Sequence, residues 1–140
     1  MRKCEKLENE EIIIGEKRLL MTEDLFANNI VLQKSFQFAL EIIVYCEELE
    51  FKKKFIIAKQ LLKSGTSVGA NVNEAQHAES NDDFIHKMKI AIKEAEETKY
   101  WLLLCQYSAS YPKNENLILK VEVLIKIISE IIITSKNKKK

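Results

Sequence analysis

Residues 63–76 read KSGTSVGANVNEAQ, a run of small and polar residues inside a long helical pattern. Glycine, serine, threonine and asparagine are poor residues for a helix interior, because they free the backbone or compete for its hydrogen bonds. A helix that keeps them usually brings another backbone close, or buries hydroxyl and amide groups that meet partners. The stretch therefore predicts a packing or assembly surface more clearly than any reaction.

Two stripes run along the helix predicted for residues 53–78. One is apolar and faces the core. The other lies about 100° around the helix and is small and polar but nearly uncharged, whereas a solvated face would carry more lysine and glutamate. We expect this second stripe to be at least partly buried against another helix. The predicted helix-packing or oligomer seam comprises Gln60, Ser64, Gly65, Ser67, Gly69, Asn71 and Glu74.

The composition favours long helices. The chain has 140 residues, 46% of them hydrophobic, with only three glycines and one proline. This balance argues against a sandwich or barrel and for one helical domain. Three widely spaced cysteines without a CxxC pair indicate reduced thiols in a cytoplasmic protein. No apolar run reaches the roughly 18 residues of a membrane span, so we expect no membrane contact.

Apolar periodicity and turn residues predict the order of the elements. Ser80 is expected to cap one helix and Asn114 another. The expected fold is an all-α, up-down-up-down antiparallel four-helix bundle at residues 25–135, with an N-terminal extension at 1–24 and a Lys-rich tail at 136–140. Its helices are predicted at residues 28–48, 53–78, 81–109 and 115–134.

The last predicted helix carries more apolar surface than one core needs. Its apolar positions cover an arc of about 220°, whereas a bundle helix needs closer to about 100–160°. We expect another subunit or the N-terminal segment to cover the excess.

Two blocks resemble a known family. Residues 60–75 read QLLKSGTSVGANVNEA and residues 91–102 read AIKEAEETKYWL, with Asp83-Phe84-Ile85 ahead of the second block. They resemble signatures of the bacterial four-helix-bundle proteins first noticed in intervening sequences of 23S ribosomal RNA genes, over about residues 29–135. The resemblance implies a four-helix bundle that assembles as a ring-like homo-oligomer, most often a pentamer.

The same family includes the accessory variability determinant proteins of diversity-generating retroelements, which bind a reverse transcriptase and nucleic acid through a basic surface. The resemblance therefore implies, as an alternative, binding of structured RNA or DNA together with a protein partner. Here residues 25–135 carry 13 basic and 14 acidic residues, so the body lacks a basic excess. The possible nucleic-acid contacts are Lys52, Lys53, Lys54, Lys59 and Lys63.

A metal-dependent bundle enzyme is a second alternative. Glu74 and His77 form a Glu-x-x-His, and Asp83 and His86 form an Asp-x-x-His, on either side of one predicted turn. Di-metal bundle proteins use Glu-x-x-His pairs but add a glutamate from each of the other two helices, which this chain does not evidently supply. Solvated histidines near a turn are the simpler interpretation, and we assign no metal, cofactor or catalytic residue.

These observations favour a non-enzymatic, cytoplasmic homo-oligomer that acts as a scaffold or adaptor. Its partners would be further copies of itself and a protein or nucleic acid that the residues do not identify.

Overall fold

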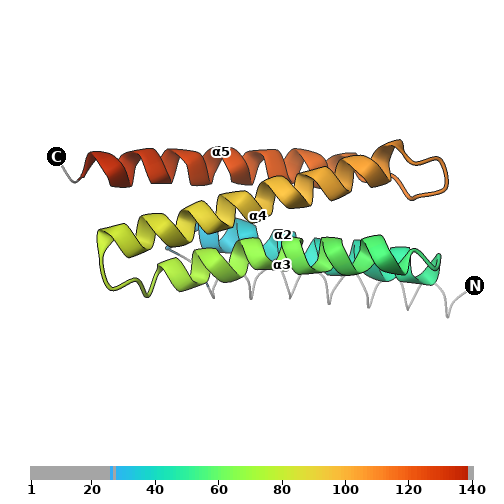
Figure 1. The fold of residues 1–140 in the computed structure, drawn as a ribbon, viewed down its shortest axis with the longest axis horizontal. Helices are drawn as coiled ribbons and strands as arrows, with labels where there is room; N and C mark the ends of the chain where they lie inside the picture. Colours follow the sequence, from blue (N-terminus) through green and yellow to red (C-terminus); the bar gives the residue numbers. More distant parts are fainter. Residues whose placement is uncertain (1–25, 27, 139–140) are drawn as a thin grey trace, which may run out of the picture.

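The computed structural model describes residue 26 and residues 28–138. Within these residues the chain forms four helices and no strand (Figure 1). The predicted N-terminal extension at 1–24 and the last two residues of the predicted tail lie outside the described residues. The helices are α2 (Ile30–Phe51), α3 (Phe55–Ala75), α4 (Asn81–Tyr107) and α5 (Glu115–Asn137).

The helices form an up-down-up-down bundle, which confirms the predicted fold. Each helix packs against the next in the sequence, and α5 closes the ring by packing against α2 (Figure 1). One hydrophobic core fills the centre, as expected when each helix turns a single apolar face inward. Its largest fully buried apolar side chains are Phe38, Ile42, Leu49, Leu61, Met88, Leu102, Leu124 and Ile128.

The caps set where the helices begin. Ser80 accepts a hydrogen bond from the backbone N–H of Asp83 at 3.0 Å, so α4 begins where the sequence predicted. α2 begins two residues later than predicted, because the Asn29 side chain accepts from the N–H of Leu32 at 3.1 Å and fixes the first turn. α5 runs three residues beyond the predicted end at Thr134.

The turn between α2 and α3 explains why α3 begins at Phe55. Lys53 has a φ of 63°, in the left-handed region where glycine is usual. The N–H of Lys54 bonds to the carbonyl of Leu49 at 2.8 Å, and the N–H of Lys53 bonds to that of Glu50 at 2.9 Å. These two bonds satisfy carbonyls at the end of α2, which therefore extends to Phe51 rather than ending at Glu48.

None of the described helices is long and apolar enough to cross a membrane.

Candidate interaction surfaces

The two glycines of the predicted seam bring α3 against α2. A Cβ built on Gly65 would lie 2.8 Å from Cγ2 of Ile42, a distance that real Cβ atoms essentially never show. A Cβ on Gly69 would lie 3.4 Å from the carbonyl oxygen of Ser35, which is ordinary contact. The absent side chains therefore allow α2 to lie directly against this part of α3, as expected of small residues at a helix interface.

A buried hydroxyl pair joins α3 to α4. Ser64 and Thr98 are almost fully buried, and the Thr98 hydroxyl lies 3.0 Å from that of Ser64. The Ser64 hydroxyl also lies 3.4 Å from the carbonyl of Leu61, and Thr98 lies 2.7 Å from that of Glu94. Both hydroxyls therefore have partners within one protomer, as buried polar groups require.

The remaining seam residues lie progressively nearer to solvent. Ser67 and Asn71 are partly buried and donate to carbonyls of their own helix, at 2.6 Å and 2.8 Å. Gln60 and Glu74 are exposed, and Glu74 pairs with Lys87 of α4 at 3.2 Å. The middle of the seam is thus occupied by intramolecular packing, while its two ends are open.

Glu94 lies on α4 beside this seam and is only partly exposed. Burial raises the pKa of its carboxyl above the ordinary value, and the neighbouring Glu97 raises it further. Lys63 and Lys93 oppose both effects by lowering the pKa. The seam therefore meets a carboxylate that is harder to ionise than a solvated one.

Of the five candidate lysines, one contacts another part of the bundle and four are exposed. Lys54 is turned toward the α4–α5 loop, where its Nζ lies 3.3 Å from the Ser110 hydroxyl and 5.0 Å from the centre of the Tyr111 ring. The other four, Lys52, Lys53, Lys59 and Lys63, are exposed. The end of α2 beside them also exposes three acids, Glu47, Glu48 and Glu50. The surface around these lysines therefore carries charges of both signs.

Comparison with known proteins places the chain in a family. Residues 27–131 match the family described as 23S rRNA-intervening sequence protein. The chain is 40% identical to a crystallised protein of unknown function from the S23 ribosomal protein family of Bacteroides thetaiotaomicron VPI-5482. The match has a TM-score of 0.70 and covers 74% of this chain and 98% of that chain. The chain belongs to the 23S rRNA-intervening sequence protein family. No protein of curated function matches it.

The structure does not bring together the four residues of the metal hypothesis, which are Glu74, His77, Asp83 and His86. His77 and His86 are exposed. Glu74 is held by Lys87, and a carboxylate oxygen of Asp83 lies 3.3 Å from the backbone nitrogen of Glu79. Among the described residues, no group of three or more histidine, cysteine or acidic side chains is placed to hold a metal ion.

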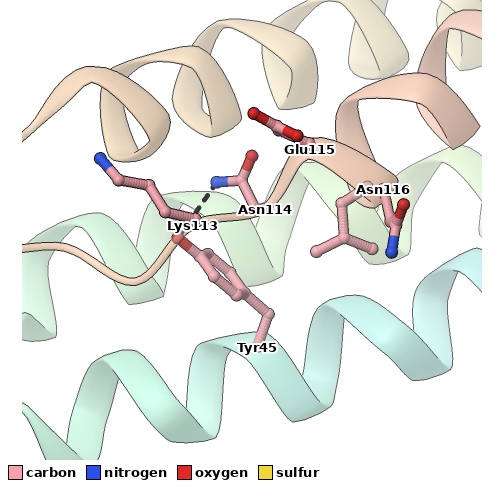
Figure 2. Close-up of a pocket in the computed structure, with 6 residues that line it drawn as sticks. Tyr45, Lys113, Asn114, Glu115 and Asn116 are labelled. Carbon is pink, nitrogen blue, oxygen red and sulfur yellow. Dashed lines mark hydrogen bonds between the residues drawn. The ribbon is translucent and has the colours of Figure 1, made fainter.

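A polar tie that the sequence did not predict joins α2 to the loop before α5, as Figure 2 shows. Tyr45 donates its hydroxyl proton to the carbonyl of Pro112 at 2.7 Å and accepts from the Asn114 amide at 3.1 Å. That amide also donates to the carbonyl of Leu102 at 3.0 Å. Asn114 stands at the N-cap position of α5, but its side chain makes no capping bond, so the expected role of this side chain was wrong.

The tie borders a pocket of about 530 Å³ between α2 and the start of α5. Burial raises the pKa of the Tyr45 hydroxyl well above its usual range, although the bond from Asn114 lowers it in part. Because Tyr45 and Asn114 already bind each other, we interpret the pocket as part of the contact that holds α2 to the loop before α5. Its lining residues are Tyr45, Lys113, Asn114, Glu115, Asn116 and Leu117.

The family member also exposes apolar side chains on the outer surfaces of its helices. On α5, Leu119, Val123 and Ile133 are 59%, 48% and 59% exposed. On α4, Tyr100, Leu104 and Tyr107 are exposed as well. Scattered apolar residues are normal on a surface, so what matters is whether these residues form one contiguous patch.

Proposed function

We propose that this protein is a non-enzymatic homo-oligomer that serves as a scaffold or adaptor in the cytoplasm. The observation that carries the proposal is the outward apolar surface of α5, where Leu119, Val123 and Ile133 stay exposed in the protomer. The inward face of the same helix already fills the core through Val121, Leu124 and Ile128. The apolar arc is thus wider than the bundle uses, and a second copy would cover the excess.

The neighbouring helix extends the proposed subunit interface. α4 packs against α5, and Lys99 of α4 pairs with Glu122 of α5 at 3.5 Å. Tyr100 lies next to Lys99 along α4 and is exposed, as is Tyr107 two turns further on. Tyrosine is enriched at the centre of protein interfaces, because its ring buries much apolar area while its hydroxyl keeps a polar partner.

Cytoplasmic placement is supported by the thiols. Cys46 and Cys105 are buried and free. Free buried cysteines suit a reducing compartment, since an oxidising one selects for paired cysteines. The ring-like assembly, with five subunits as the most common number, is what the resemblance described above implies, and we carry it as part of the proposal.

Sedimentation and light scattering test the oligomer directly. We expect the native protein to have a mass several times that of the 16.3 kDa protomer. Leu119→Glu and Ile133→Glu should shift it toward the protomer while the helical circular dichroism is kept, because a charge in a buried interface is costly. Lys59→Glu on α3 is the matched control and should leave the mass unchanged, because α3 does not pack against α5.

Two results would remove the proposal. One is a native protein that sediments as a single protomer at micromolar concentration. The other is an assembly that keeps its mass in both α5 variants, since the interface would then lie on a different surface.

A further inference from the structure

An exposed apolar surface of the described chain lies on the outer side of α2. Its residues recur at helical spacing over sixteen positions, and the fifteen steps between the first and the last cover about 22 Å along the axis. Their exposed fractions run from 37% to 88%. This α2 stripe consists of Phe36, Leu40, Ile43, Val44 and Phe51.

The bundle does not use the α2 stripe, because α2 contacts its neighbours through other faces. Toward α3 it presents Ser35 and Ile42, which lie against the two seam glycines. Toward α5 it presents Glu41, which pairs with Lys120, and Tyr45, which bonds to the loop before α5. The stripe lies on the remaining side of the helix.

The described chain begins at one end of this stripe. The Phe26 ring packs against the Phe36 ring, with a centroid separation of 5.3 Å and an interplanar angle of 59°. The carbonyl of Phe26 accepts a hydrogen bond from the N–H of Asn29 at 2.9 Å, which closes a turn before α2. The Asn29 amide donates to Gln76 at 3.1 Å and ties this turn to the end of α3. The chain therefore already lies on the stripe at Phe26.

The 25 residues before Phe26 have the length and composition to cover the rest. As a helix they would reach about 37 Å, more than the length of the stripe. Leu7, Ile14 and Met21 recur every seven residues, which places them near one face of a helix. Leu25 falls on the same face, four residues after Met21. An apolar helical face of this length matches an apolar stripe that begins where the segment ends.

We propose that residues 7–25 pack along the α2 stripe of their own chain and run antiparallel to α2 from Phe36 toward Phe51. This is an intrachain docking surface, and it does not depend on the proposed scaffold function.

Hydrogen–deuterium exchange of the full chain, followed by mass spectrometry, tests the proposal. Amides of residues 7–25 should exchange at least about tenfold more slowly than in an unstructured chain. Leu40→Glu should abolish this protection, because it places a charge under the segment. Lys93→Glu changes the charge of an exposed residue on α4, which does not pack against α2, and should leave the protection intact.

A second variant covers the case in which Leu40→Glu weakens the bundle itself. Met21→Glu alters only the segment, so it should release residues 7–25 while the exchange of α3 and α4 stays native. A dilution series distinguishes the two candidate occupants of the α2 stripe, the N-terminal segment of the same chain and a second copy. Protection that persists at concentrations where any oligomer has dissociated supports docking within one chain, whereas protection that disappears with the oligomer overturns it in favour of a second copy. Free exchange of residues 7–25 in the native protein also overturns it.

Discussion

The close approach of α2 and α3 at Gly65 can be measured by comparing alanine at the two seam glycines. Both substitutions replace glycine in a helix interior, which should stabilise the folded state by about 1 kcal/mol each. They differ in the space that the new methyl group meets. At Gly65 it would lie 2.8 Å from Cγ2, 3.0 Å from Cγ1 and 3.3 Å from Cβ of Ile42, whereas at Gly69 the nearest atom is 3.4 Å away.

Ile42 has little freedom to move aside. It is fully buried, and a β-branched side chain in a helix has one strongly preferred rotamer. The methyl group at residue 65 must therefore push the helices apart, at an overpacking cost of about 1–3 kcal/mol. Because the propensity gain is common to both variants, Gly65→Ala should be less stable than Gly69→Ala by about 1–3 kcal/mol.

Urea unfolding followed by circular dichroism, at one fixed protein concentration, gives the two free energies of unfolding. A double-mutant cycle identifies the contact. Ile42→Ala alone should cost about 2–5 kcal/mol, but clearly less in the Gly65→Ala background, because it removes both γ carbons that the new methyl group meets. Equal stability of the two alanine variants, together with additive effects in the cycle, would refute the close approach.

Three further predictions follow from single contacts. Lys53→Gly should stabilise the protein by about 0.5–1 kcal/mol in urea unfolding, because Lys53 has a positive φ, whereas Lys52→Gly at a φ of −85° should bring no gain. Thr98→Val should cost about 1 kcal/mol, and the Ser64→Ala, Thr98→Val pair should cost less than the sum of its parts. Burial raises the pKa of Cys46 to about 12 from an ordinary 9.0, so the stability that its neutral thiol contributes is complete below about pH 9 and is lost toward about pH 12. Between these pH values, the free energy of unfolding should fall less steeply with pH for Cys46→Val than for the native protein. An unchanged slope would contradict the raised pKa of Cys46.

The fold was predictable because several local signals agree. The apolar spacing predicted the helices, and Ser80 predicted the start of α4. The scarcity of glycine and proline argued against a sandwich or barrel fold. Glycine inside a helical pattern implies that another chain segment comes close. The sequence does not say which helix that segment belongs to, and the structure shows that the glycines face α2.

The features that sequence reasoning missed depend on distant residues or on unusual backbone. Tyr45 and Asn114 are 69 positions apart, and neither belongs to a periodic pattern that would pair them. Once Tyr45 reaches the loop, the Asn114 amide has a buried partner and no longer caps α5, so tertiary packing overrides the local preference. The left-handed turn at Lys53 gave no signal, because the usual glycine is absent.

We propose different covers for the two outward apolar surfaces, a segment of the same chain on α2 and a second copy on α5. The bond between Asn29 and Gln76 fixes that start beside the end of α3. Since α3 packs against α2 and α4 but not against α5, this start lies on the α3 side of α2. The Phe26 ring packs against Phe36 of the α2 stripe, whereas Leu119, Val123 and Ile133 of α5 are exposed. Leu40→Glu should therefore change segment protection but not mass, and Leu119→Glu should change mass but not segment protection.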